Sequence, residues 1–361
     1  MQPDIYLFGF STWKHPFIKP FLPQDAKLFF INPLFSRHYL AKARSKGLSH
    51  TSVIYIWGKK PFTEVEAYAK EHGIKVCRVE DGFIRSVGLG SDLTQPYSLV
   101  VDTRGIYFDP SQESDLEDLL NFHKFTAQEL TRAKHLREVL IEKKLSKYNN
   151  YENTTLDLPQ NRKVILVPGQ VEDDASIRFG AEGMSNLQLL KEARLSDEKA
   201  YIIYKPHPDV LAGNRVGSVS EQEGLTYCDQ IVTEVSLDSV LCLADEVHTM
   251  TSLVGFEAMM RGITVYTYGM PFYAGWGLTH DKQKCTRRKR EVNLDELTVA
   301  ALLLYPNYID PNTNLECEVE VTMMGLESQR QKLADSRRYR ILTKARNLVS
   351  RKSQQLLRFI G

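Results

Sequence analysis

The 361-residue sequence is long enough for two domains of ordinary size, each with its own hydrophobic core. Its 46 Lys and Arg residues nearly balance 45 Asp and Glu residues, which argues against a protein whose whole surface binds nucleic acid. Five cysteines without CxxC spacing indicate neither a disulfide framework nor a zinc site, so a reducing compartment is expected. Because the N-terminus has no basic leader and no run of about 18 apolar residues occurs, we expect a soluble cytoplasmic protein.

Short apolar segments alternate with amphipathic ones in the first half of the chain, which is typical of parallel α/β sheets. We expect strands over residues 5–10, 27–33, 52–58, 75–81 and 98–102. Helices are expected over residues 62–73, 115–125 and 127–145. The polar stretch that follows, residues 146–162, is the best candidate for a linker.

The second half repeats this alternation. Strands are expected over residues 163–169, 201–208, 229–234, 245–250 and 263–269, with helices over residues 252–262 and 294–306. We therefore predict an α/β protein with two facing Rossmann-like domains and a basic amphipathic helix at the C-terminus. The predicted boundaries are residues 1–150 for the N-terminal domain, 162–325 for the C-terminal domain and 326–361 for the basic segment.

Ligands of such open sheets bind at the carboxyl ends of the strands, so polar segments that follow strands are the candidate sites. The sequence has neither a complete GxGxxG fingerprint with its later acidic residue nor a GxxxxGK[ST] motif, so dinucleotide and P-loop sites lack support.

The first polar segment, "EDGFIRSVGLGS", begins with Glu80 and Asp81 at a strand end. Gly82 permits a sharp turn, and Arg85 and Ser86 follow at once. A plain Asp-Gly turn is the simpler interpretation. A carboxylate pair, an arginine and a glycine-rich loop within twelve residues favour a functional site.

The second segment, "YKPHPDV", holds His207 between Pro206 and Pro208, which fix the backbone on both sides of the imidazole. With Lys205 beside it, such a histidine suits an anionic leaving group. The alternative is a structural histidine in a rigid turn.

The third segment, "EVHTMTSLVGFEAMMRG", places Thr251 and Ser252 at the start of a helix, whose first amides have no partner within the helix. Hydroxyls at a helix N-terminus form a phosphate cradle, and Glu257, about one and a half turns later, is a candidate for binding ribose. The alternative is N-capping, which accounts for one hydroxyl. We interpret His248 as a histidine at a strand end rather than as a site residue.

The fourth segment, "VPGQVEDDAS", presents Glu172, Asp173 and Asp174 together after a strand. A solvated turn accepts any polar residue, whereas a nucleophile or general base requires a bare carboxylate. The sequence spacing does not show which of the three carboxylates would serve as the nucleophile or base. Together the four segments suggest a two-domain nucleotide-sugar glycosyltransferase, and the lack of a clear DxD metal cage favours a mechanism that needs no metal or other cofactor.

The sequence resembles the KpsC/LipB family of capsular-polysaccharide transferases of 3-deoxy-D-manno-oct-2-ulosonic acid (Kdo). The resemblance rests on "EDGFIRSVGLGS", "GQVEDDAS", "YKPHPD", "TSLVGFEAMMRG" and "PFYAGWGLT", in that order. It implies a GT-B-like fold with the acceptor at the N-terminal domain, a CMP-β-Kdo donor and transfer with retention of configuration. The implied acceptor is a Kdo oligomer on (lyso)phosphatidylglycerol.

The resemblance also implies roles for individual residues. In the family motif Q-x-x-x-D, aligned on Gln170, the nucleophile is Asp174, and we assign Glu80 as the acid/base. His207 is the third catalytic residue implied and would hold the CMP phosphate together with Thr251 and Ser252. The other substrate-binding residues implied are Gln170, Glu257 for the ribose, Arg85 with Ser86 or Lys205 near the Kdo carboxylate, and Tyr273 and Trp276 as a wall beside the donor.

Larger family members carry two such modules, whereas this sequence has one, most like their C-terminal module. Residues 329–361 hold ten Lys and Arg residues against one acid, so they either contact an anionic membrane on its cytoplasmic face or pack against the N-terminal domain. Association with other capsule biosynthesis or export proteins is a further expectation. The rival functions are a sialyltransferase-like enzyme with another CMP-sugar and a non-catalytic capsule assembly or export protein.

Overall fold

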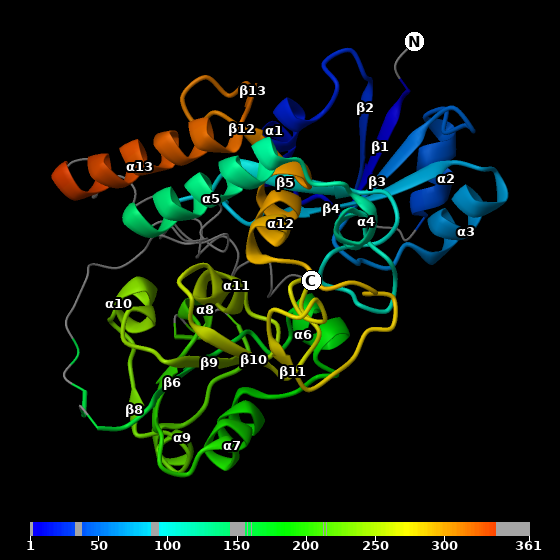
Figure 1. Ribbon diagram of the computed structural model, residues 1–361. Coiled ribbons are helices and arrows are strands. Elements are labelled where there is room, and N and C mark those ends of the chain that lie inside the picture. The colour runs from blue at the N-terminus through cyan, green and yellow to red at the C-terminus, as the bar shows by residue number, and fades with distance from the viewer. Residues whose placement is uncertain are drawn as a thin grey trace.

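A computed structural model describes residues 3–32, 38–87, 94–144, 156, 158–159, 161–211, 213 and 215–336. Two α/β domains lie one above the other in Figure 1, each built on its own sheet. All ten strands expected from the sequence form, and the α/β class with two Rossmann-like domains is confirmed.

The first domain is built on a seven-stranded sheet with the order β13-β12-β5-β4-β3-β1-β2. Its strands are β1 (Ile5–Phe8), β2 (Leu28–Ile31), β3 (Val53–Trp57), β4 (Lys75–Asp81), β5 (Ser98–Asp102), β12 (Pro306–Ile309) and β13 (Glu316–Cys317). The strands from β2 to β4 are parallel, but β5 runs antiparallel to β4, and β12 runs antiparallel to both β5 and β13. The sheet is therefore mixed rather than wholly parallel.

The helices of this domain connect the strands and cover the sheet (Figure 1). They are η1 (Thr12–Lys14), α1 (His15–Ile18), η2 (Lys19–Phe21), α2 (Tyr39–Ser45), α3 (Thr63–Glu71), α4 (Asp115–Phe122), α5 (Ala127–Glu142), α12 (Leu294–Thr298), the π-helix η4 (Val299–Leu304) and α13 (Val319–Asp335). Helix α5 begins at a capping box, in which Thr126 and Glu129 satisfy one another's backbone amides.

The second domain has a six-stranded sheet, with the order β11-β10-β9-β6-β7-β8 and every pair parallel. Its strands are β6 (Val164–Pro168), β7 (Tyr201–Lys205), β8 (Gln230–Ile231), β9 (Glu246–Thr249), β10 (Thr264–Thr267) and β11 (His280–Asp281). Its helices are α6 (Ala175–Gly180), α7 (Asn186–Ser196), α8 (Pro208–Leu211), α9 (Glu221–Gly224), α10 (Leu237–Leu241) and α11 (Leu253–Met260). This strand order is that of the Rossmann fold.

The predicted C-terminal domain, residues 162–325, extends too far. From Leu294 onward the chain returns to the first domain, where Tyr308 of β12 pairs with Ser98 of β5. The return is anchored by Tyr305, whose hydroxyl donates a 2.7 Å hydrogen bond to the buried Asp102. The second domain therefore ends before α12, and the first domain is discontinuous in sequence.

The predicted basic segment, residues 326–361, begins inside α13. At its start, Arg330 donates hydrogen bonds to the carbonyls of Lys143 and Lys144 after α5, which places this part of α13 against the first domain. The residues after 336, including most of the predicted basic helix, lie outside the described part of the chain. Within the described ranges, no helix has both the length and the apolar character needed to cross a bilayer.

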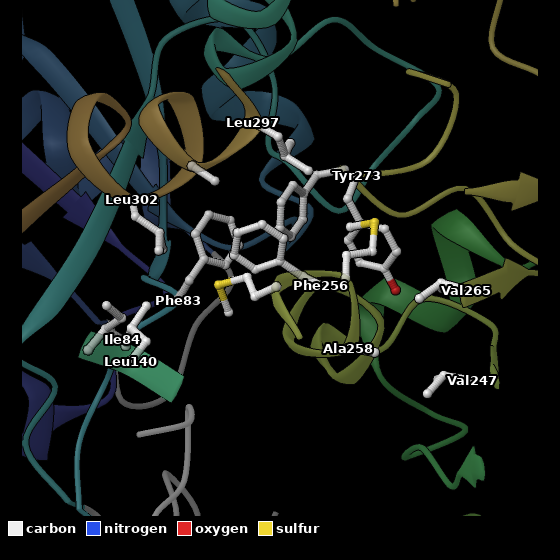
Figure 2. Close-up of a cluster of buried hydrophobic side chains, with 14 of the residues drawn as sticks. Phe83, Ile84, Leu140, Val247, Phe256, Ala258, Val265, Tyr273, Leu297 and Leu302 are labelled. Atoms are coloured by element: carbon white, nitrogen blue, oxygen red, sulfur yellow. The ribbon is translucent and has the colours of Figure 1, made fainter. Parts of the chain in front are cut away.

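An aromatic cluster joins the two domains at their interface (Figure 2). The ring of Phe272, in the second domain, lies 4.5 Å from that of Phe83 in the first domain and 5.4 Å from that of Phe256 on α11. Because this core is continuous across the interface, the two sheets are held as one packed unit.

Candidate functional site

The carboxyl ends of β6 and β9 form the crevice in which a Rossmann sheet binds its ligand. These strands are neighbours, and the connections from them lead to opposite sides of the sheet. Gln170 follows β6, whereas Thr251 and Ser252 follow β9. Two of the four predicted segments therefore meet at this switch point.

Gln170 joins the two segments. Its side-chain Nε2 donates to the hydroxyl of Thr251 at 3.0 Å, and its Oε1 accepts from the backbone N–H of Thr251 at 2.9 Å. Asn186 fixes the backbone of Gln170 in turn, because its side chain accepts from the N–H and donates to the carbonyl of that residue. The side chain of Gln170 is buried, so we read it as a residue that orders the crevice.

Ser252 is the N-cap of α11, and its hydroxyl accepts from the N–H of Val254 at 3.2 Å. The hydroxyls of Thr251 and Ser252 thus both have hydrogen-bond partners within the protein. N-capping accounts for the Ser252 hydroxyl alone, and Gln170 binds the Thr251 hydroxyl. Thr251 and Ser252 are only partly buried, so they lie at an accessible helix start. Glu257 lies buried on the same helix.

Gly169 allows the loop after β7 to approach the switch point closely. A Cβ at this position would lie 3.2 Å from the backbone nitrogen of His207. The ring of His207 accepts from the N–H of Asp209 through Nδ1 at 3.1 Å, so the neutral ring carries its proton on Nε2. This orientation suits a donor to an anionic group.

The side chain of Lys205 is buried below this loop. Its ammonium donates to the carbonyl of Val235 at 2.6 Å, and burial lowers its pKa to about 8. The predicted contact with a sugar carboxylate is therefore not favoured by this placement.

The three carboxylates after β6 have different surroundings. Glu172 accepts from the N–H of Asn186 at 2.7 Å, and Asp173 forms a 3.1 Å ion pair with Arg215. Asp174 is the N-cap of α6, and its Oδ1 accepts from the N–H and hydroxyl of Ser176. Its Oδ2 lies 3.9 Å from Arg215, and the side chain is 46% exposed, so this oxygen is accessible.

Glu80 and Asp81 end β4 in the first domain. Asp81 accepts a 2.6 Å hydrogen bond from Arg85, which also donates to the hydroxyl of Ser86 and the carbonyl of Thr94. Arg85 and Ser86 are both buried, so their predicted contact with substrate is not favoured. Their hydrogen bonds order the turn that presents Glu80.

Lys14 is a neighbour of this carboxylate pair that the sequence reasoning missed. It follows β1, and its ammonium lies 3.0 Å from the centre of the Trp57 ring at the end of β3. Burial lowers its pKa to about 8, and the charges of Asp81 and Glu80 oppose this shift. The rule that ligands gather at strand ends, applied to β1, would have identified Lys14.

Tyr273 and Trp276 do not form the predicted wall beside the donor. Both side chains are completely buried: the Tyr273 hydroxyl donates to the carbonyl of Ser252, and the Trp276 indole donates to the carbonyl of Phe272 at 2.8 Å. Figure 2 shows Tyr273 inside the aromatic cluster. Their role is to pack the interface and to hold the start of α11.

Helix α6 connects the two halves of the candidate site. The ammonium of Lys59, in the first domain, lies 5.4 Å from the centre of the Phe179 ring on α6 and pairs with Asp109. A Cβ at Gly58, the residue before Lys59, would lie 3.1 Å from a carboxylate oxygen of Glu80. The helix that Asp174 caps therefore contacts the segment against which Glu80 lies.

Among the described residues, no group of three or more His, Cys, Asp and Glu side chains is placed to hold a metal ion. The expectation of a metal-independent mechanism stays a prediction.

Comparison with known proteins identifies relatives. The family model "Capsule polysaccharide biosynthesis protein" matches residues 52–308. The capsule polysaccharide modification protein LipA of Neisseria meningitidis serogroup B is 43% identical over 91% of this chain and 46% of its own length. The lipopolysaccharide-processing protein LpsZ of Rhizobium meliloti is 38% identical over 90% of this chain and 74% of its own. This chain thus spans about half the length of LipA.

Two solved structures of Thermosulfurimonas dismutans KpsC share the fold. The beta Kdo 2,7 transferase is 38% identical, with a TM-score of 0.74, over 91% of this chain and 99% of that chain. The beta Kdo 2,4 transferase is 30% identical, with a TM-score of 0.78, over 91% of this chain and 98% of that chain. The two-domain fold is therefore GT-B-like, and this protein belongs to the capsule polysaccharide biosynthesis family as a KpsC/LipB-like member.

Proposed function

We propose that this protein is a retaining β-Kdo glycosyltransferase of capsular-polysaccharide biosynthesis, with CMP-β-Kdo as donor and a lipid-linked Kdo oligomer as acceptor. Its likeness to two Kdo transferase structures over nine tenths of the chain supports the reaction class. The observation that carries the mechanism is the accessible carboxylate of Asp174 at the carboxyl end of β6, on the helix that contacts the first domain.

In the proposed first step, an oxygen of Asp174 attacks the anomeric carbon of Kdo, and the bond from that carbon to the CMP phosphate oxygen breaks. The electron pair of the broken bond leaves on the phosphate. His207 donates to the phosphate through Nε2, and the start of α11 at Ser252 stabilises its charge.

In the second step, Glu80 takes the proton from the attacking hydroxyl of the acceptor as that oxygen bonds to the anomeric carbon. The bond to Asp174 breaks, and its electrons return to the carboxylate. Two inversions at one carbon give net retention.

The surroundings set Glu172 apart from the two aspartates, both of which are exposed, and the family motif Q-x-x-x-D on Gln170 supports Asp174 over Asp173. Glu172 is committed to the amide of Asn186, and Asp173 is paired directly with Arg215. Asp174 holds its cap through one oxygen and leaves Oδ2 accessible near Arg215, which orients it for attack.

The test is intact-mass spectrometry of the protein mixed with CMP-Kdo and no acceptor. We expect the wild-type protein to gain the mass of one Kdo residue and to release CMP. Asp174→Ala should form no adduct and lose at least about a thousandfold in turnover, as expected for removal of a nucleophile. Asp173→Ala, a matched change at the adjacent exposed carboxylate, should retain the adduct.

Other outcomes would favour the rival functions. An adduct or product formed from CMP-sialic acid alone would identify another CMP-sugar as the donor. Full capsule function in Asp174→Ala without CMP binding would indicate a non-catalytic assembly or export protein. Cytoplasmic location, contact with an anionic membrane and association with other capsule proteins remain predictions.

A further inference from the structure

A cavity of about 500 Å³ lies in the first domain beside the interface. It is lined by the segment after β3, by α3 and by β4, and Phe179 of α6 lines it from the second domain. Its volume falls within the range of about 300–1,000 Å³ that is typical of small-ligand sites. Both domains therefore contribute to one cavity that lies outside the nucleotide crevice.

Four of the nine lining residues are basic, beside apolar ones such as Pro61 and Phe179. Lys59, Lys60, Lys70 and Arg78 line the cavity, and Glu66 is the one acidic residue among the lining residues. Arg78 forms a 2.5 Å ion pair with Glu66, and Lys59 pairs with Asp109 behind the lining. Among the described residues, Lys60 and Lys70 are therefore the lining cations that form no ion pair. A ligand with negative charges suits this surface.

The cavity lies near Glu80 and is lined by the helix that Asp174 caps. Arg78 donates to the carbonyl of Gly58, the residue against which Glu80 lies. Burial lowers the pKa of Lys60, and the charge of Glu80 opposes that shift, so the two groups lie within electrostatic reach. Phe179 lies five residues after Asp174, roughly 8 Å along α6 at 1.5 Å per residue.

We propose that this cavity, lined by Lys59, Lys60 and Lys70, binds carboxylate groups of an acidic oligosaccharide acceptor. The inference rests on the proposed function, because a Kdo oligomer carries one carboxylate on each residue. The acceptor end would reach Glu80, while preceding acidic residues occupy the cavity. The donor cradle lies on the second sheet, so both substrates fit at once.

Direct binding tests this inference separately from catalysis. A water-soluble, fluorescently tagged Kdo oligosaccharide without lipid or phosphate is titrated with protein, and the dissociation constant is measured by fluorescence anisotropy. Lys70→Glu should weaken binding about tenfold, the equivalent of one charge-assisted contact. Ala67→Trp, which fills the cavity from the exposed face of α3 without changing its charge, should also weaken binding.

Lys75→Glu is the matched control, because Lys75 is exposed at the opposite end of β4 from Glu80 and does not line the cavity. It should bind like the wild type. The same oligosaccharide with its carboxylates as methyl esters should bind wild-type protein at least about tenfold more weakly than the acid form does. Lys70→Glu should weaken binding of that ester no further.

Three results would overturn the assignment. The first is unchanged binding of the oligosaccharide by both Lys70→Glu and Ala67→Trp. The second is that Lys70→Glu weakens binding of the methyl ester as much as binding of the acid form. The third is that these variants weaken binding only of acceptors that carry a lipid phosphate. The proposed function is judged separately by the Kdo adduct: wild-type protein that binds the oligosaccharide but forms no adduct would refute the transfer mechanism and leave the acidic subsite standing.

Discussion

A partly buried lysine beside two carboxylates carries a charge that the fold disfavours. Lys14 sits over the Trp57 ring, and its pKa falls to about 8 from 10.5, chiefly because of burial. Below pH 8 the folded protein holds an ammonium group that it disfavours, whereas above 10.5 the group is neutral in both states. Between these values the stability contribution of Lys14 rises with pH, by about 3 kcal/mol in total.

We therefore predict that Lys14→Met raises the free energy of unfolding at pH 7 by about 1–3 kcal/mol, since an apolar side chain of similar length removes a charge that is partly withdrawn from water. The advantage of the Met variant should shrink as pH rises from 8 to 10.5. Urea unfolding of both proteins across this range measures the difference. Lys14→Arg, which keeps its charge throughout, should gain no such stability. If the Met variant were less stable than wild type at pH 7, the stabilisation from the contact between Lys14 and Trp57 would exceed the cost of desolvating the ammonium group.

Among the predicted site residues, the local structure set by neighbouring residues was predictable from the sequence, whereas the burial set by distant packing was not. Ser252 caps its helix because a hydroxyl precedes an apolar run, a local signal. Nothing local shows that Arg85 and Trp276 are buried. The glycines around Trp276 suggest an exposed turn, but the ring fills an interface made by segments far apart in sequence.

At the scale of elements, the central strands were predictable and the edge of the first sheet was not. Buried strands of α/β sheets are short apolar runs, which the sequence displays for β1 and β6. Strand β12 begins with Pro306 and Asn307 and has no such run. Its partner β5 lies in the first half of the chain, so only the folded structure reveals the pair.

Strand β9 carries a buried histidine whose charge the fold opposes. His248 lies between the hydroxyl of Tyr268, 3.0 Å from Nδ1, and a carboxylate oxygen of Glu246, 3.4 Å from Nε2. Burial lowers its pKa from 6.5 to about 4, although Glu246 favours the charged form. The neutral ring therefore stabilises β9 above pH 6.5, and this stability is lost as pH falls from 6.5 towards 4.

We predict that this loss amounts to about 3 kcal/mol, from a pKa difference of roughly 2.5 units. His248→Gln, which cannot titrate, should be less stable than wild type at pH 7 and should approach wild-type stability as the pH is lowered to 4. Chemical denaturation at several pH values measures the gap. His135→Gln, at an exposed histidine on α5, should leave the pH dependence unchanged. A constant gap in His248→Gln would contradict the argument.

At the scale of the whole molecule, an ion cluster around the buried carboxylate of Glu117 joins the domains beside the aromatic core. Glu117 on α4 accepts from Arg287 at 2.7 Å and from Arg288 at 3.3 Å, and both arginines belong to the segment that returns from the second domain. Arg288 also donates to the carbonyls of Pro271 and Ala274, so the cluster holds the aromatic loop in place.

Removing the carboxylate charge should weaken this junction strongly, because the buried guanidinium group of Arg288 and the partly exposed one of Arg287 would both lose their counterion. We predict that Glu117→Gln lowers the free energy of unfolding by about 3–5 kcal/mol. Glu113→Gln, a matched change at a partly exposed carboxylate paired with Arg104, should cost less than about 1 kcal/mol. Calorimetry of the three proteins measures the costs and shows whether one transition splits into two. Equal costs for the two variants would mean that the apolar cluster alone joins the domains.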